Sequence, residues 1–157
     1  MAFDSAHGRE VMGHYATGVA IVTALAPDGP AGFTCQTFGS LSIDSRLAFF
    51  AATTTSPSWQ RVHGVGVIGI NVLRSDQEPL ARAFARSGVD KFEGVPWTSA
   101  PNGSPFLDGC LAYLEGTIRE VATHGDHDVV VAELDFASTQ PGEPLVYYRS
   151  QYRLLAD

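Results

Sequence analysis

The apolar stretches of this chain are short, rich in β-branched residues, and mostly follow one another without a helix-length segment between them. Apolar runs of this length that are bounded by turn signals predict β-strands. Because the strands are not regularly separated by helices, the pattern disfavours a doubly wound parallel sheet. It favours a closed or nearly closed antiparallel barrel with a few short helices. The strand candidates are Thr17–Ala26, Gly32–Phe38, Leu47–Ala52, Val65–Leu73, Leu111–Val121, Asp128–Ala137, Leu145–Tyr148 and Tyr152–Leu155.

Three other segments have the signals of helices. Asp4–Ala16 begins at a residue that commonly caps helices, and Ser56–Val62 has proline directly after its serine, a residue favoured at the first helical position. Leu80–Ser87 has apolar residues at helical spacing after the capping-box pattern Ser75–Glu78, so it is the clearest helix. The proline-rich connection Asp90–Asp108 is long enough to predict a functional or interface loop.

Length, charge and cysteine content narrow the class of protein. The 157 residues predict one domain, 1–157. Lys and Arg number 10 against 17 Asp and Glu, and this net charge of −7 argues against nucleic acid or an anionic membrane surface as partner. No apolar run is long enough to span a membrane, and Met1 to Val11 lack the basic and apolar pattern of an export signal, so we expect a cytoplasmic location. Cys35 and Cys110 match no metal or redox spacing, which predicts reduced thiols.

The segment Gly64–Gly69 matches the G-x-G-x-x-G pattern of dinucleotide-binding proteins letter for letter. That motif needs a strand before it and a helix that starts within it, so that the helix N-terminus meets the pyrophosphate. Here a helix candidate precedes the glycines and Ile70–Leu73 continues a strand. The pattern therefore indicates glycines within a barrel strand, and not a dinucleotide-binding fold.

The segment Thr53–Trp59 leads a run of hydroxyl side chains into Pro57. Ser56 is then the expected N-cap, with Ser58 in the first helical turn. Backbone N–H groups at a helix N-terminus, surrounded by hydroxyls such as that of Thr55, make a site for a phosphate. An ordinary serine-capped helix after a polar loop explains the same pattern, so both interpretations stay open.

The segment Gly32–Ser40 alternates small polar and aromatic residues along a predicted strand. A face of hydroxyls and an amide could hydrogen-bond the polar edge of a planar heterocycle, and it could equally face solvent. Alternation along a strand predicts Thr34, Gln36 and Ser40 on one face and Phe33, Cys35 and Thr37 on the other.

Two further residues are candidates for chemistry. The segment His124–Asp128 has the spacing H-x-x-H, but no helix aligns the two rings and no third ligand is evident, so no metal site is predicted. His127 held by a neighbouring carboxylate could donate a hydrogen bond near neutral pH, although a surface turn is an equal alternative. Lys91 is the only lysine, either solvated or a partner for a phosphate or carbonyl group.

The chain has no nucleophile elbow, Walker A motif or pair of carboxylates that would support a hydrolase or a nucleotide triphosphatase.

Several of these segments occur together in one order: ATGVAIVT, GFTCQTFGSLSID, TSPSW, GINVL, FARSGVDKF, LDGCLAYLE, GDHDVVVAEL and YYRSQY. In this order and spacing the chain resembles the flavin reductase-like family over roughly Met12 to Leu155. Within that family it looks most like the reductase components of two-component aromatic or steroid monooxygenases.

The resemblance implies a mainly β protein, an FMN-binding split β-barrel of antiparallel Greek-key type with a few short helices. It also implies a homodimer that binds FMN or FAD and takes hydride from NADH or NADPH. The reduced flavin would then reach a separate flavin-dependent monooxygenase by diffusion. Because flavin and nicotinamide carry the hydride chemistry themselves, the lack of a visible nucleophile or acid–base pair agrees with this activity. The alternatives are a flavoprotein that keeps its flavin and oxidises or oxygenates a small organic substrate, and a non-enzymatic protein that binds flavin or haem.

The resemblance also implies roles for individual residues. The strand Thr34–Phe38 would contact the flavin ring, and the hydroxyl-rich helix start would surround the flavin phosphate. Lys91 and Phe92 match positions near the flavin, His127 matches the residue that positions the nicotinamide, and Tyr152 matches one that can close over the pocket. The predicted site thus has His127 as its catalytic residue and, for flavin, Thr34, Cys35, Gln36, Thr37, Ser40, Thr55, Ser56, Ser58, Trp59, Lys91, Phe92 and Tyr152.

Overall fold

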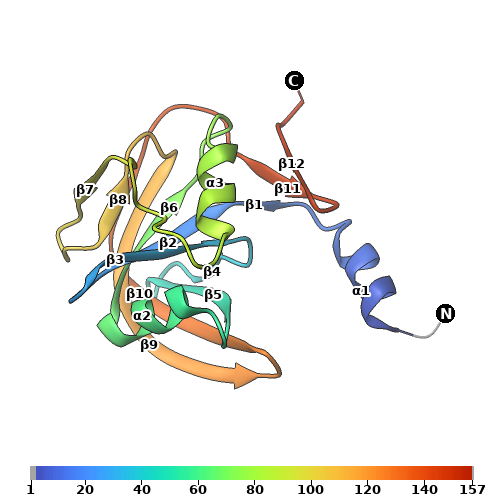
Figure 1. Cartoon of the computed structure of the whole chain (residues 1–157), viewed down its shortest axis with the longest axis horizontal. Helices are drawn as coiled ribbons and strands as arrows, with labels where there is room; N and C mark the ends of the chain where they lie inside the picture. The colour runs from blue at the N-terminus through green and yellow to red at the C-terminus, as the bar shows by residue number, and fades with distance from the viewer. Residues whose placement is uncertain (1–2, 157) are drawn as a thin grey trace.

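The computed structural model describes residues 3–156 and is built mainly of β-strands (Figure 1). The predicted fold class, a mainly β split barrel with a few short helices, is confirmed. In chain order the elements are α1 (Ser5–Met12), β1 (Thr17–Gly18), β2 (Ala20–Ala26), β3 (Gly29–Cys35), β4 (Gly39–Ser42), β5 (Leu47–Thr53), α2 (Pro57–Val65), β6 (Val67–Val72), α3 (Glu78–Ala85), β7 (Trp97–Ser99), β8 (Pro105–Leu107), β9 (Ala112–His124), β10 (His127–Thr139), β11 (Val146–Tyr148) and β12 (Gln151–Arg153).

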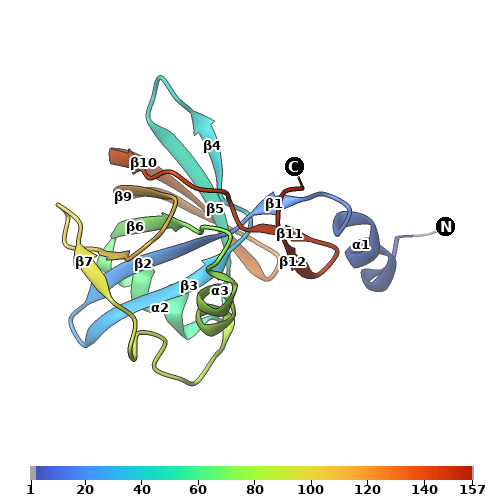
Figure 2. The ribbon, with the colours of Figure 1, turned by 90° about the horizontal axis from the view of Figure 1, so that it is seen from above.

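The barrel is one seven-stranded antiparallel sheet in the order β3-β2-β6-β9-β10-β5-β4. Strands β9 and β10 are its longest hairpin, paired from His124 and His127 at the turn to Ala112 and Thr139. Strand β3 contacts β5 without pairing with it, so the sheet curves back on itself without closing (Figure 2). Two small sheets, β1-β11-β12 and β7-β8, lie beside it.

Strand β2 is buried on both of its faces, which separates two hydrophobic cores. Ala20 and Val22 point into the barrel interior, where α2 contributes Trp59. The intervening Ile21 belongs to a second core, which α3 covers with Phe84. The near-continuous apolar sequence of β2 follows from this position, because a strand with one solvated face would alternate with polar residues. As a result, α2 and α3 both contact β3, but α2 packs in the barrel core and α3 in the second core.

Helix α2 begins and ends as its sequence predicts. The Ser56 hydroxyl accepts a hydrogen bond from the Trp59 backbone N–H at 3.2 Å, and Pro57 takes the first helical position. The helix ends at Gly66, whose φ of 83° favours glycine. Strand β6 then follows, so the G-x-G-x-x-G segment is the end of a helix and the start of a strand, as expected.

Several element predictions are wrong in part. The expected strand Thr17–Ala26 is divided at Val19, because β1 pairs with β11 in a separate sheet while β2 belongs to the barrel. Helix α3 begins at Glu78 and not at the Ser75 capping box, because the Ser75 N–H donates to the Glu143 carbonyl oxygen and the Gln77 side chain instead accepts from Arg74. The expected loop Asp90–Asp108 contains the hairpin β7-β8. The expected strand Gly32–Phe38 ends at Cys35. No helix within residues 3–156 is long and apolar enough to cross a membrane.

Candidate functional site

A cavity of about 410 Å³ lies where the ends of β3 and β5, the start of α2 and the end of α3 meet. Of the predicted flavin residues, β3 and the residues after it supply Thr34, Cys35, Gln36 and Thr37, and the start of α2 supplies Thr55 and Ser56. Lys91 and His127 line the same cavity. The structure therefore brings together most of the predicted site from segments that lie far apart in the sequence. The other lining residues are Phe33, Ala51, Ala52, Thr53, Pro57, Phe84, Ala85, Arg86 and Ser87.

The end of β3 forms the polar wall of this cavity. The Thr34 hydroxyl donates to the Ala81 carbonyl oxygen at 2.6 Å, which ties the wall to α3. The Thr37 hydroxyl accepts from the Ala51 N–H at 2.8 Å, and the Cys35 Sγ lies 3.2 Å from that hydroxyl. Burial raises the pKa of the Cys35 thiol, which therefore stays protonated and uncharged. Gln36 is exposed at the cavity.

The predicted alternation of faces is correct for Phe33, Thr34 and Cys35 but does not continue to Ser40. Because the strand ends at Cys35, the residues that follow leave the pleat, and side chains expected on opposite faces line one cavity. Ser40 lies outside it, on β4 in a second hollow. The period of two holds only while the backbone stays extended.

The start of α2 offers fewer backbone donors than its sequence suggested. Pro57 has no N–H, the Trp59 N–H is taken by the Ser56 hydroxyl, and the Gln60 N–H donates to the Ser56 carbonyl oxygen. The Ser58 N–H is the remaining amide of this first turn. A phosphate at this position would therefore need donors from elsewhere.

Lys91 connects three elements around the cavity. Its Nζ donates to the Ser58 Oγ at 2.9 Å, to the Phe84 carbonyl oxygen at 2.9 Å and to the Gly32 carbonyl oxygen at 3.2 Å. An ammonium has three hydrogens, so these bonds use its full donor capacity. The side chain is half-buried, and desolvation lowers the pKa of Lys91. Lys91 therefore ties β3, α2 and α3 together beneath the site.

His127 is the first residue of β10 and pairs with Thr53 in the ladder between β10 and β5. Its Nδ1 lies 2.8 Å from the Asp126 carboxylate, the neighbour that the sequence suggested. This bond lowers the pKa of Asp126. Because a carboxylate anion only accepts hydrogen bonds, Nδ1 is the protonated nitrogen, and Nε2 lies 3.4 Å from the Thr53 hydroxyl. The Thr54 N–H also donates to the Asp126 carbonyl oxygen at 3.0 Å, which joins this hairpin turn to the loop before α2.

Four other predicted residues do not line the cavity. Trp59 is 1% exposed in the barrel core and donates its Nε1–H to Asp128 at 2.8 Å. Phe92 packs edge-on against Phe84 in the second core. The hydroxyl of Ser58 reaches the site through Lys91. The Tyr152 ring packs against Tyr147 and under the Arg82 guanidinium.

Sequence analysis missed Arg86 and Ser87, which follow α3 and line the cavity. The sequence contained a signal for both residues, because they belong to the segment FARSGVDKF on which the family resemblance depended. Neither residue type stands out in a polar stretch of sequence, where solvated arginines and serines are common.

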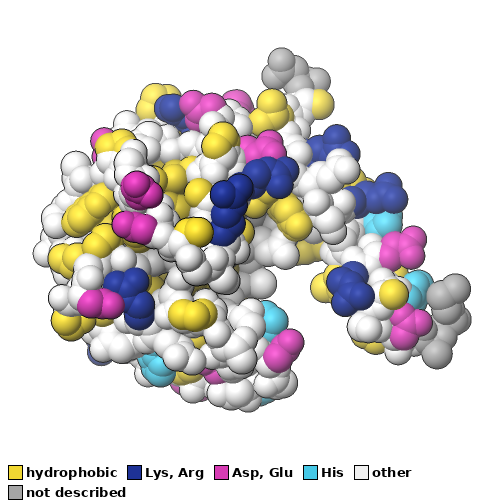
Figure 3. Space-filling model, in the orientation of Figure 1, with side chains coloured by type: hydrophobic (Ala, Val, Ile, Leu, Met, Phe, Trp, Pro, Cys, Tyr) yellow, Lys and Arg dark blue, Asp and Glu magenta, His cyan; other side chains and the backbone are white. Residues whose placement is uncertain are grey.

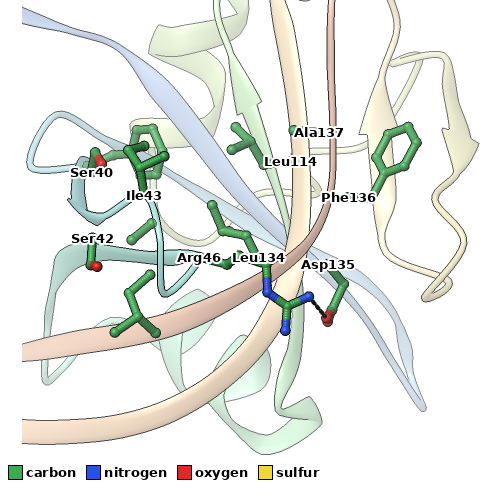
Figure 4. A pocket seen from close by; sticks show the side chains of 12 residues that line it. Ser40, Ser42, Ile43, Arg46, Leu114, Leu134, Asp135, Phe136 and Ala137 are labelled. Carbon is green, nitrogen blue, oxygen red and sulfur yellow. Dashed lines mark ion pairs between the residues drawn. The ribbon is translucent and has the colours of Figure 1, made fainter.

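A second hollow, of about 360 Å³, lies on the other end of the same sheet (Figure 4). Its lining is mostly apolar, with Ile43, Leu114, Leu134 and Phe136 among the side chains. Arg46, its one cation among the described lining residues, is neutralised by Glu133 at 2.6 Å and lies 3.9 Å from Asp135. We refer to this hollow, between β4, β5, β9 and β10, as the apolar groove.

Comparison with known proteins identifies the family of this chain. Residues 12–156 match the family described as the flavin reductase like domain. The chain belongs to this family. It is accordingly an oxidoreductase of the flavin reductase type, and the resemblance stated from the sequence is confirmed.

Similar proteins cover nearly the whole chain. It is 38% identical, over 96% of its length and 78% of the relative's, to the reductase subunit HsaB of a flavin-dependent monooxygenase from Rhodococcus jostii. A crystal structure of nitrilotriacetate monooxygenase component B from Mycobacterium thermoresistibile superposes with a TM-score of 0.93 at 35% identity, over 98% of this chain and 87% of that one. The NADH:FAD oxidoreductase SgcE6 of Streptomyces globisporus, in complex with NAD and FAD fragments, superposes with a TM-score of 0.91 at 30% identity, over 98% and 93% of the two chains.

Proposed function

We propose that this chain reduces FMN or FAD with NADH or NADPH and releases the reduced flavin to a separate monooxygenase component. The flavin reductase activity follows from family membership. HsaB and nitrilotriacetate monooxygenase component B are both named as parts of monooxygenase systems, which supports the same role for this chain.

We place both substrates in the cavity at the end of β3. The observation that carries this placement is the composition of the cavity, where hydroxyls, an amide, a histidine and two cations converge and no carboxylate is among the described lining residues. A flavin presents carbonyl and amide groups at one end and phosphate at the other, and both fit such a lining. SgcE6 is named as a complex with NAD and FAD fragments, which supports binding of both groups by this chain.

The side chains in this cavity bind and orient. When bound, flavin and reduced nicotinamide supply the hydride chemistry. The Cys35–Thr37 wall presents hydroxyl and amide groups to the edge of a planar ring, and the uncharged thiol leaves that wall neutral. His127, held through Nδ1 by Asp126, directs Nε2 to the region beside Thr53, where it can hold the nicotinamide amide. His127 thus orients the hydride donor and takes no proton from it.

We further propose that two copies of this chain associate through the apolar groove. Ile43, on the rim of the groove, is 79% exposed, and Phe136 within it is 39% exposed. Helix α1 stands apart from the barrel, with Val11 and Met12 exposed (Figure 3). An eight-residue helix is not stable in water without a packing surface. Each copy thus has an uncovered convex element and an uncovered groove, and reciprocal contact between two copies would cover both.

The first experiment is the consumption of NADH and NADPH by the purified chain, with and without added FMN or FAD. Turnover that depends on added flavin is the expected result, and the ratio of rates identifies the preferred flavin and nicotinamide. A protein that retains bound flavin and does not oxidise reduced nicotinamide would contradict the proposal and favour a flavoprotein that acts on its own substrate. The cytoplasmic location stays a prediction from the sequence.

A further inference from the structure

We propose that Arg86, a residue without an assigned role, binds the phosphate of the flavin, and that Lys91 positions the wall of the cavity without touching the phosphate. This inference rests on the proposed function and assigns its phosphate-binding residue.

The cavity has the opposite charge balance from the chain as a whole. The chain has 17 acidic and 10 basic residues, yet the described lining of the cavity contains Arg86, Lys91 and His127 and no Asp or Glu. Asp126 lies beside the His127 ring, so Arg86 and Lys91 supply the positive charge of this lining, which favours an anionic ligand. Both flavin cofactors carry phosphate, so an anionic group is expected at this place.

Lys91 is poorly suited to bind that anion directly. Its three donors are already used by Ser58, Phe84 and Gly32, at 2.9 to 3.2 Å. A phosphate could gain a hydrogen bond from Nζ only if one of these bonds broke. Lys91 thus acts on the ligand through the wall that it holds together, which makes it a positioning residue.

Arg86 is the cation with unused donors. It ends α3, and its backbone N–H donates to the Ala83 carbonyl oxygen, but its guanidinium has no hydrogen-bond or ion-pair partner within residues 3–156. Its planar guanidinium can donate two parallel hydrogen bonds to a phosphate. Of the described arginines that have no carboxylate partner, Arg86 is the one that lines the cavity. Five others are paired with carboxylates: Arg46, Arg61, Arg74, Arg82 and Arg119.

The start of α2 cannot replace this cation. Of its first amides, the Ser58 N–H alone is open, since Pro57 lacks one and Trp59 donates to Ser56. One amide and the hydroxyl of Thr55 can orient a phosphate but do not neutralise it. Arg86, on the opposite wall, supplies the missing charge, so the phosphate would lie between α2 and the end of α3.

The test compares flavins with and without phosphate. The Arg86→Gln variant should raise the KM for FMN about ten-fold, equivalent to about 1.4 kcal/mol, with kcat unchanged. Its KM for riboflavin, which has the same ring and no phosphate, should stay within about two-fold of the parent's. Arg86→Lys should recover part of the FMN affinity, because it keeps the charge and loses the paired geometry. Lys91→Met should weaken FMN and riboflavin alike, since it disturbs the wall and not the phosphate contact.

Three results would overturn the assignment. The first is an unchanged preference of Arg86→Gln for FMN over riboflavin, and the second is a parent protein that binds both flavins equally. The third is a raised KM for NADH or NADPH with FMN unaffected, which would assign Arg86 to the dinucleotide phosphates. Binding of FMN and riboflavin, followed by flavin fluorescence without nicotinamide, gives the same comparison if the parent does not turn over, so failure of the proposed activity remains distinguishable.

Discussion

The cavity and the apolar groove are two hollows of similar volume on one sheet, about 410 and 360 Å³, with opposite chemistry. Strand β5 contributes to both, with Leu47 and Ala48 at the groove and Ala51 to Thr53 at the cavity. The groove neutralises its one cation with carboxylates, whereas the cavity has cations and no carboxylate among its described residues. A groove without net charge suits another protein surface, and a polar cavity with unused donors suits a small anionic molecule.

The largest effect is expected from a charge placed at the groove. Ile43→Glu puts a carboxylate on a side chain that is 79% exposed in the single chain, so folding should be unaffected. If two copies meet there, burial of this charge should weaken association at least 100-fold, about 2.7 kcal/mol. Sedimentation velocity across a concentration series measures the change. Val89→Glu, at an exposed position outside the groove, is the matched control, and equal dimerisation of both variants would refute the groove as the interface.

The wall of the cavity should be the next most sensitive feature. Lys91→Met leaves three backbone or hydroxyl acceptors without their donor, and we expect a loss of about 2 kcal/mol in the free energy of unfolding. Urea denaturation measures it. Arg119→Met, which removes an exposed ion pair with Glu133, should cost less than about 0.5 kcal/mol. Equal losses would mean that Lys91 is an ordinary surface cation.

A smaller effect is expected at His127, where we propose that the cavity holds nicotinamide. His127→Gln should raise the KM for the reduced nicotinamide about ten-fold, about 1.4 kcal/mol, because an amide cannot reproduce the Asp126-held ring. FMN binding should be unchanged. If flavin affinity falls and the nicotinamide KM does not, His127 belongs to the flavin part of the cavity.

The smallest effect is expected in the pH dependence of stability that Asp128 contributes. Hydrogen bonds from Thr123 and Trp59 lower the pKa of Asp128 in the folded protein. The stability that Asp128 contributes is therefore present above its unfolded pKa of about 3.9 and is lost as the pH falls through the lowered folded value. Urea midpoints measured from neutral pH down to about pH 3 should fall less steeply for Asp128→Asn than for the parent. Parallel curves would contradict this origin of the shift.

The sequence predicted the barrel and part of the cavity because those features are encoded locally. The apolar runs identify the strands, and Ser56 with Pro57 fixes the start of α2. The Ser75 capping box failed because Glu143, distant in sequence, takes the Ser75 N–H. Strand alternation could not predict that the chain leaves the pleat after Cys35.

The site predictions failed for residues whose positions depend on contacts between elements distant in the sequence. Tyr152 packs on Tyr147 and Arg82, and Ser40 faces the groove, since both depend on how distant elements meet. Arg86 could not be distinguished from a solvated arginine until its place on the cavity wall was known. The roles of the residues that do line the cavity remain predictions for the variants above.

The burial of β2 on both faces also determines the order in which the protein opens. Its amides are hydrogen-bonded to β3 and β6, and its two faces are covered by separate cores under α2 and α3. If either helix detaches locally, the other face of β2 stays shielded. Hydrogen exchange at the amides of Ile21 and Val22 should therefore require unfolding of the whole barrel. Their exchange rates give a reference with which the faster exchange expected in the cavity walls can be compared.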